Sequence, residues 1–489
     1  MVKKQNILCM LQNHIKMLKI TQGKKFKILI LILAFVLIFG THLKFSPDNN
    51  DLWLHLVSGK VISESNSVPK TDVLTFTKQG EEWSVHEWLY QSTGYFIYKH
   101  FGLTGLLVIK SLFVCLCLAL LFYLIKDSFY IGLFVTLLVS YGLTLFSDIR
   151  PHVLSWVFLI FTLILIKKNK EWFLPALILL WGNLHPLHLI GLVIIALYLG
   201  PKYLKTKNKK YLFVMILSVI AAALNPMGIK TFFVPFNIIS PFITEWKPFS
   251  PAGLYFWIFG AFILLGILSF VKKRKLNISD AMLFILLTYL GYSSRRHVAQ
   301  AFILLTPIII NNFQFRFKFL FERDLKKDIM FVVIIALLLF TGITYWGAFN
   351  TNFPWHKYPI LETKIIEEHN IKGNIFNRYG FGSFLEFYLY PSNLVYIDAR
   401  AETMGKELIN EYVSLGTNKK EDIPKIIEKN NITIVIVAHD MNIGNYFLNH
   451  PDWKLINVND EWASFVLNTE ETKNVPEIDL SSSKYVQLD

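Results

Sequence analysis

Small groups of histidine, acidic and arginine residues stand beside long apolar runs in this sequence. Asp51 and His55 are four residues apart, and His86 directly precedes Glu87. Carboxylates and imidazoles so spaced can exchange protons or bind a metal ion. Further members of the set are Asp148, Arg150, His152, Asn183, His185, His188, Asn225, Glu245, Arg295, Arg296 and His297. Polar residues at membrane edges tend to line a cavity or path, so these groups predict one shared cavity.

The first group carries candidate catalytic residues. Asp51 and His55 would share a helix face, where the carboxylate could orient the imidazole or the pair could hold a metal ion. Asp51 could instead only extend the helix cap, because a first turn favours negative charge. Glu87 and His86 are further catalytic candidates, although Ser84 and Glu87 also fit a capping box, which would make Glu87 structural.

The arginines are candidate substrate-binding residues. Arg150, Arg295 and Arg296 could anchor apolar spans to lipid headgroups by reaching toward them. Two adjacent arginines on the outer side run against the usual distribution of charge in membrane proteins, which favours an anion site for at least one of them. His152 and His297 flank these arginines and belong to the same predicted site.

A second histidine pair, His185 and His188, has helical spacing and could ligate a metal ion, but Pro186 between them disturbs that spacing. Asn183 and His185 are assigned to substrate binding. The sequence contains neither Gly-x-x-x-x-Gly-Lys-Ser/Thr nor Gly-x-Gly-x-x-Gly after a strand, so it carries no nucleotide signature.

Composition then indicates what positions these residues. The chain has 489 residues, of which 53% are hydrophobic, and a mean hydropathy of +0.43. It holds three cysteines, too few for a disulfide framework. Apolar runs near the length of a membrane helix predict eleven spans: 26–43, 103–125, 129–147, 152–166, 172–185, 187–200, 211–224, 253–271, 277–292, 297–311 and 328–347.

The distribution of basic residues predicts the orientation. Lysines and arginines crowd segments 1–27, 167–170, 202–210, 272–275 and 316–327, which all fall on one side when the spans alternate. The positive-inside rule makes that side, and the N-terminus, cytoplasmic. The net charge of +14 is then mostly loop charge and does not indicate nucleic-acid binding. The candidate residues gather on the opposite, outer side of a cell membrane.

Two outer segments are long. The loop 44–101 predicts an amphipathic helix from Asp51 to Ile62, capped by Asp48 or an Asn, and a second helix from Val85 to Tyr98, both lying at the interface. Residues 1–347 form the predicted transmembrane domain. Residues 348–468 alternate strand-like and helical patterns, which predicts an extracytoplasmic α/β domain, and residues 469–489 predict a disordered tail.

The order of the motifs resembles the GT-C superfamily of integral membrane glycosyltransferases, and within it a bacterial family of polytopic membrane proteins. The matching elements are Asp51-Leu52-Trp53-Leu54-His55-Leu56, His86-Glu87-Trp88-Leu89, Arg150-Pro151-His152, Trp181-Gly182-Asn183-Leu184-His185 and Asp398-Ala399-Arg400. GT-C enzymes often carry paired acids in the first motif, whereas Asn49 and Asn50 precede Asp51 here, which disfavours a two-acid metal site.

The resemblance implies transfer of a sugar from a polyprenyl-phosphate donor to a glycan, lipid or protein acceptor. Asp51 would be the general base, an arginine would stabilise the departing phosphate, and Asp398 and Arg400 would help to hold the acceptor. No cofactor is required, and a divalent metal is possible. Two alternatives stay open: a lipid or solute transporter or flippase, which predicts polar groups on both sides or at mid-membrane, and a non-catalytic envelope assembly factor.

Overall fold

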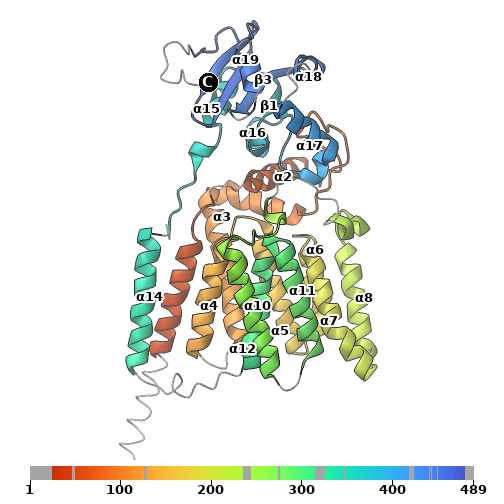
Figure 1. Ribbon diagram of the computed structural model, residues 1–489. Coiled ribbons are helices and arrows are strands. Elements are labelled where there is room, and N and C mark those ends of the chain that lie inside the picture. Colours follow the sequence, from red (N-terminus) through yellow and green to blue (C-terminus); the bar gives the residue numbers. More distant parts are fainter. Residues whose placement is uncertain are drawn as a thin grey trace, which may run out of the picture.

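The protein consists of a helical bundle and a smaller domain with a β-sheet at one end of it, as a computed structural model shows (Figure 1). The structure describes residues 25–46, 50–125, 129–234, 244–273, 276–313, 325–345, 349–417, 423–439, 441, 443–448 and 450–478. Asp48 and Asn49, two of the predicted capping residues, lie outside these ranges.

Each predicted apolar run contains a helix of the bundle. Four helices are long and apolar enough to cross a membrane, namely Lys25–His42, α3 (Trp88–Leu124), α7 (His188–Thr206) and α10 (Leu254–Lys272). The others are α4 (Phe129–Leu143), α5 (Pro151–Lys167), α6 (Leu174–Gly182), α8 (Lys209–Ala223), α11 (Ile278–Ser293), α12 (Val298–Phe313) and α14 (Leu325–Tyr345). A polytopic membrane protein is confirmed, and the count of eleven spans is supported in part.

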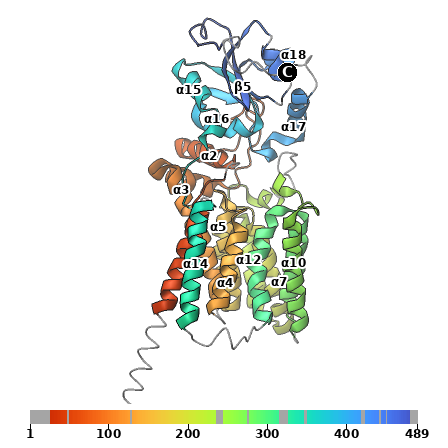
Figure 2. The same ribbon diagram turned by 60° about the vertical axis from the view of Figure 1, so that its left-hand side comes forward.

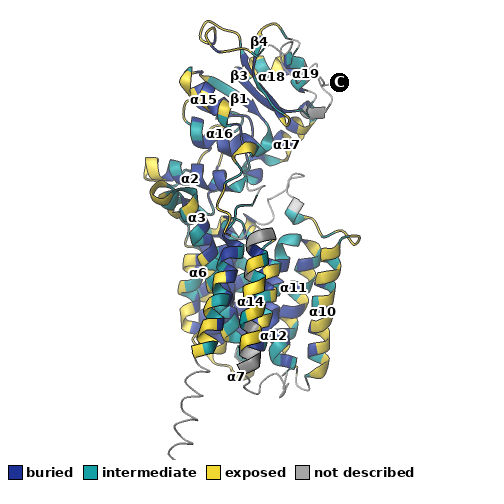
Figure 3. Ribbon diagram, turned by 90° about the vertical axis from the view of Figure 1, so that its left-hand side faces the viewer, coloured by how far each residue is buried: buried dark blue, intermediate teal, exposed yellow. Residues whose placement is uncertain are grey.

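The outward faces of the bundle are apolar. Leu254 and Val271 on α10 and Tyr289 on α11 are exposed, and exposed residues line the outer sides of α10 and α14 (Figure 3). Contiguous exposed apolar surface of this kind marks contact with a membrane or a partner. Buried residues face the middle of the bundle, where Trp156 and Trp181 are fully enclosed.

The helix α2 (Asp51–Ser65) and the first part of α3 lie across the end of the bundle (Figures 1 and 2). The predicted helix from Asp51 is present as α2, but it is not amphipathic, because its buried residues include Leu52, Trp53, Val57 and Ile62 and surround the helix. It packs between α3 and the sheet domain.

The second predicted loop helix is also revised. It begins at Trp88 rather than Val85, and it continues into the span as α3 with a break at Gly102, where φ is 63°. Glu87, not Ser84, occupies the cap position, and the Glu87 side chain makes no capping hydrogen bond. The predicted capping box is therefore absent, which leaves the Glu87 carboxylate available for other contacts.

The sheet domain confirms the expected mixture of helices and strands. Its five-stranded sheet has the order β2 (Asn393–Val395), β1 (Gly373–Asn377), β3 (Ile432–Ala438), β5 (Trp462–Leu467) and β4 (Trp453–Val458). The first three strands are parallel, and β5 is antiparallel to both of its neighbours. Its helices are α15 (Ile360–Glu368), α16 (Gly382–Leu389), α17 (Ala401–Thr417), α18 (Ile423–Lys429) and α19 (Ile443–Leu448).

Two features of this domain differ from the sequence predictions. The strand β4 was not predicted, because its pattern of buried residues does not alternate regularly. The expectation of a disordered segment from residue 469 does not hold for residues 469–478: the side chain of Thr472 is buried and donates to the Leu467 carbonyl, and the Ile478 N–H donates to Leu455 in β4. Residues 479–489 lie outside the described ranges.

The loop that follows α2 joins the two parts. Thr75 pairs with Val395 at the outer edge of β2, and the Thr77 hydroxyl donates to the Tyr396 carbonyl at 2.6 Å. The loop therefore covers the edge of the sheet, which would otherwise expose unpaired backbone groups. One apolar core runs continuously from α2 and α3 into the α/β domain, so the domain is fixed against the end of the bundle that carries the candidate residues.

Candidate functional site

A cavity of about 570 Å³ lies between the end of the bundle and the α/β domain. Most of the residues that the sequence singled out line it, which supports the prediction of one shared cavity. They are Asp51, His55, His86, Glu87, Arg150, His152, His185, Arg296, His297 and Arg400. They come from α2, the start of α3, the start of α5, the turn between α6 and α7, the turn before α12, and the α/β domain.

The bundle side of the cavity is built around Arg150. Its Nη1 donates to Glu245 Oε2 at 2.8 Å, and its Nε lies 3.3 Å from Asp51 Oδ2. Arg296 stacks on the ring of Trp246 and lies 3.8 Å from the other Glu245 oxygen. The Asp51 side chain is 37% exposed. A bound molecule can therefore reach this carboxylate, as well as the two arginines beside it.

Electrostatics separates the two acids of this group. Burial alone would raise the pKa of Glu245, but the positive charges of Arg150 and Arg296 outweigh it and lower that pKa. The balance is reversed at Asp51, where burial raises the pKa and Arg150 opposes the rise without cancelling it. Glu245 is therefore a fixed counter-ion, whereas Asp51 is a carboxylate with an increased affinity for protons.

A second group surrounds Glu87. Its carboxylate oxygens lie 3.5 Å from His55 Nδ1, 3.5 Å from His185 Nε2 and 3.8 Å from His86 Nε2. Burial raises the pKa of Glu87 to about 7. Burial, with the charge of Arg150 next in importance, lowers the pKa of His55 to about 3, so this imidazole is neutral at neutral pH. Glu87 can thus bind and release a proton near neutral pH.

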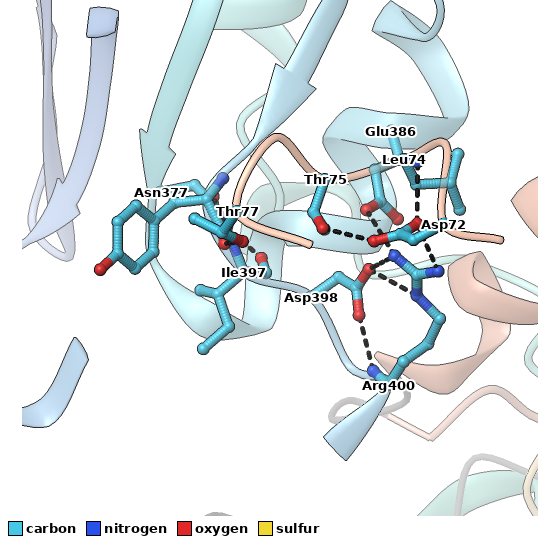
Figure 4. A network of polar contacts seen from close by, with 10 residues as sticks. Asp72, Leu74, Thr75, Thr77, Asn377, Glu386, Ile397, Asp398 and Arg400 are labelled. Atoms are coloured by element: carbon cyan, nitrogen blue, oxygen red, sulfur yellow. Dashed lines mark hydrogen bonds and ion pairs between the residues drawn. The ribbon is translucent and has the colours of Figure 1, made fainter. Parts of the chain in front are cut away.

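The α/β domain forms the roof of the cavity, where Tyr379 and residues 399–402 line it. Arg400 is held in place by three hydrogen bonds, which its backbone N–H and Nε donate to Asp398 and its Nη1 donates to Asp72, all at 2.7 Å (Figure 4). The ring of Trp83 covers the guanidinium at 4.5 Å. Arg400 is only 1% exposed, so it holds the roof in position and offers little surface to a ligand.

A second cavity of about 390 Å³ adjoins the first. The two share His152, Glu245 and Arg296 as lining residues. Arg295 lines only the second cavity, where its guanidinium lies over the ring of Phe249. Its other walls are mainly apolar and include Leu145, Phe146, Phe249 and Tyr255.

Three predicted binding residues do not line the main cavity. Arg295 lines the second one, and Asp398 is fully buried beside Arg400. Asn183 joins elements instead: its Oδ1 accepts from Trp88 Nε1 at 2.8 Å, and its Nδ2 donates to the Leu224 carbonyl at 3.0 Å. Each stands within two residues of one that lines the main cavity, namely Arg296, Arg400 and His185, so sequence position alone does not separate them.

No metal centre is formed by the described residues. They contain no group of three or more His, Cys, Asp or Glu side chains placed to hold an ion. Ser155 shares a hydrogen bond with His185 Nδ1 at 2.9 Å, and His188 Nδ1 contacts the His185 carbonyl, so this histidine pair does not converge on one point.

Three residues that shape the site were not singled out from the sequence: Asp72, Glu386 and Glu402. Glu245 was named in the polar set but was given no individual role. Glu386 carried a usable signal, because it is the one acid within the apolar stretch of α16. Glu402 lies two residues after Arg400 in a predicted motif. Asp72 gave none, because its partner is Arg400, far away along the chain.

No protein-family model matches the chain, and no curated protein matches it in sequence. Among solved structures it is similar to the cryo-EM structure of the arabinofuranosyltransferase AftD from Mycobacteria, with a TM-score of 0.51 and 10% sequence identity. The similarity covers 92% of this chain but 40% of that one, so this chain spans less than half the length of that protein. At this identity the likeness concerns the fold alone. The chain therefore shares the overall fold of that arabinofuranosyltransferase.

Proposed function

We propose that this chain is a membrane glycosyltransferase that moves a sugar from a polyprenyl-phosphate donor to an acceptor outside the cytoplasm. The observation that carries the proposal is an accessible carboxylate, Asp51, 3.3 Å from the guanidinium of Arg150 in a cavity at the end of the bundle. Glycosyl transfer requires a base for the acceptor hydroxyl and positive charge for the departing phosphate. The GT-C-like fold is consistent with this reaction.

Asp51 is the general base in this proposal. It takes the proton from the acceptor hydroxyl as the oxygen forms its bond to the anomeric carbon of the sugar and the bond from that carbon to the lipid phosphate breaks. Its raised pKa favours this role, because a base works best when its pKa approaches the working pH. Glu87, whose pKa is about 7, can then hold the proton that is released.

Arg150 and Arg296 receive the phosphate. Both already lie beside Glu245, and a phosphate arriving between them would replace part of that carboxylate's contacts with charge-assisted hydrogen bonds. The adjoining cavity, with its apolar walls and Arg295, suits the lipid end of the donor. The donor would then enter from the membrane with its phosphate stopping at Arg296, which lines both cavities.

The test compares cells that lack the gene with cells that carry the wild-type gene, the Asp51→Asn variant or the Glu64→Gln variant. Glu64 is an exposed acid near the other end of the same helix, so Glu64→Gln is the matched control. Mass spectrometry measures the lipid-linked sugars and the envelope glycans in each strain.

Without the gene, we expect one lipid-linked sugar to accumulate and one glycan to lose a residue. Asp51→Asn should reproduce this change at a normal protein level, and Glu64→Gln should not. Unchanged lipid-linked sugars and glycans on loss of the gene would overturn the proposed function. A normal glycan in the Asp51→Asn strain would remove Asp51 from the role of base.

A further inference from the structure

The roof of the main cavity contains one acidic side chain with no assigned role. Four consecutive residues of the α/β domain line the cavity, Ala399, Arg400, Ala401 and Glu402. The two alanines offer only methyl groups, and Arg400 is fixed by Asp398 and Asp72. Of these four residues, Glu402 is therefore the one whose functional group is available to contact a bound molecule.

Glu402 lies in the first turn of α17 and is partly exposed. Among the residues that the structure describes, it forms neither an ion pair nor a hydrogen bond. It faces the group around Glu87 closely enough for its negative charge to help raise the pKa of Glu87. The two carboxylates thus line the same cavity and influence each other electrostatically.

The other acids of the cavity, unlike Glu402, have basic or histidine side chains beside them. Asp51 and Glu245 lie against Arg150, and Glu87 lies among three histidines. Only donors of hydrogen bonds or positive charges can satisfy a carboxylate. The arginines that a ligand can reach, Arg150 and Arg296, are on the bundle side, where the donor phosphate is proposed to bind, whereas Arg400 in the roof is paired with Asp398 and Asp72. A ligand that reaches the roof can therefore donate hydrogen bonds to Glu402.

We propose that Glu402 accepts hydrogen bonds from hydroxyl groups of the acceptor, and that this acceptor is an uncharged glycan. The inference rests on the proposed function and assigns the roof to the acceptor. An acceptor with a carboxylate or phosphate at this point would be repelled by Glu402, because like charges in a poorly hydrated site destabilise each other. A hydroxyl-rich sugar supplies the missing donors without that repulsion.

The test uses the purified full-length protein and two fractions from cells that lack the gene. The organic extract of their membranes supplies the unused lipid-linked donor, and their envelope glycan supplies the unmodified acceptor. The rate of sugar transfer is measured at varied acceptor concentration and fixed donor concentration. It is then measured at varied donor concentration and fixed acceptor concentration. The variants are Glu402→Ala and Glu402→Gln, with Glu407→Gln on the exposed face of α17 as the control.

For Glu402→Ala, we expect the acceptor KM to rise about 10- to 100-fold, the range for losing hydrogen bonds to a charged group, with an unchanged donor KM. Glu402→Gln should raise the acceptor KM less than Glu402→Ala does. It should also lower the pH at the midpoint of the profile of transfer rate against pH, because Glu87 loses a neighbouring negative charge that raises its pKa. Glu407→Gln should match the wild type.

An unchanged acceptor KM in Glu402→Ala, with active wild-type protein, overturns this inference and leaves the proposed function standing. An equal rise in donor and acceptor KM also overturns it. Absence of transfer by the wild-type protein contradicts the proposed function itself. Thermal unfolding of each variant in detergent checks that the changes do not arise from loss of folded protein.

Discussion

Arg150 and Arg400 each lie among acidic side chains, yet the two surroundings differ in exposure. Arg150 contacts Asp51 and Glu245, whose side chains are each 37% exposed. Arg400 contacts Asp72 and Asp398 and lies 3.9 Å from Glu386, and all of these acids are fully buried. The first group faces the cavity, and the second is enclosed between the loop after α2 and the α/β domain.

The difference shows what each group can do. A partly exposed arginine can exchange a carboxylate for a ligand phosphate, since water and the ligand compensate the acid that is released. An enclosed arginine cannot, because removing either partner leaves an uncompensated buried charge. The Arg150 group is thus suited to binding, whereas the Arg400 group joins the loop to the domain and fixes the roof of the cavity.

The largest expected effect is therefore on folding, from Arg400→Met. The variant leaves Asp72 and Asp398 without their shared cation in a buried site, and breaking such a group costs roughly 3 to 5 kcal/mol. We expect a large drop in the Tm measured in detergent and a low yield of folded protein. Arg378→Met is the control, because Arg378 lies in the same domain but is 39% exposed.

A second change separates charge from packing. Adding Asp72→Asn to Arg400→Met removes one of the stranded charges, so the double variant should regain part of the lost Tm. If the double variant is no more stable than the single one, the loss arises from packing against Trp83 and not from unpaired acids.

The next effect is on turnover, from Arg150→Met. Loss of a preorganised group that stabilises developing charge commonly lowers turnover about 10²- to 10³-fold. The Tm should fall much less than in Arg400→Met, because water can reach Asp51 and Glu245. The assay is the transfer between the two fractions described above, with Lys230→Met as an exposed control. Comparable losses of Tm in Arg150→Met and Arg400→Met would contradict the distinction between the two groups.

The same two groups show what could be predicted from the sequence. The bundle helices followed from long apolar runs, and the shared cavity followed from polar residues recurring at one end of those runs. Asp51 was found because it begins the predicted helix after the first span, and Arg150 and His185 because each lies at the end of an apolar run. The signal marks which residues gather at one end of the bundle, but it does not say which of them face the cavity, and so Asn183 was misplaced.

The Arg400 group could not be predicted from the sequence, because its members come from segments that are far apart along the chain. Its partners lie in α16 and in the loop after α2, and Asp72 is 328 positions away from Arg400. Only the docking of the α/β domain on α2 brings them together. The same docking buries α2, whose pattern without that partner predicted an interfacial helix.

A third prediction tests Glu87 through the pH dependence of stability. Its pKa is about 7 in the folded protein, above the ordinary value near 4.5, so the folded state holds a proton that the unfolded chain releases. Between these values stability falls as pH rises, and the loss is complete above about 7. Glu87→Gln has no such loss, so the Tm of the variant relative to that of the wild type should increase as pH rises over this range.

The gain amounts to roughly 3 kcal/mol at most, from 1.36 kcal/mol for each unit of pKa. Tm is measured in detergent from pH 4.5 to 8, and each value is compared with the wild type at the same pH so that other groups cancel. If the difference in Tm between the two proteins stayed constant across this range, Glu87 would have an ordinary pKa and would not bind a proton near neutral pH.

The smallest effect is expected for Glu386→Gln at pH 5. Burial, followed by the negative charge of Asp398, raises the pKa of Glu386 well above its ordinary value, so the folded protein contains the neutral acid. Glutamine has nearly the same shape and the same charge, and the change in stability should stay within about 0.5 kcal/mol. As pH rises, the wild type loses stability relative to the variant, because only its unfolded chain releases the proton.

Asp398→Asn is the contrast within the same buried group. It removes a hydrogen-bonded charge from Arg400 and should cost roughly 1.5 to 3 kcal/mol at the same pH. A loss of Tm in Glu386→Gln as large as that in Asp398→Asn would show that Glu386 is ionised and is a third partner of Arg400. In that case three ionised acids would share the one buried cation of Arg400, whereas two acids contact Arg150, and the two groups would differ in charge as well as in exposure.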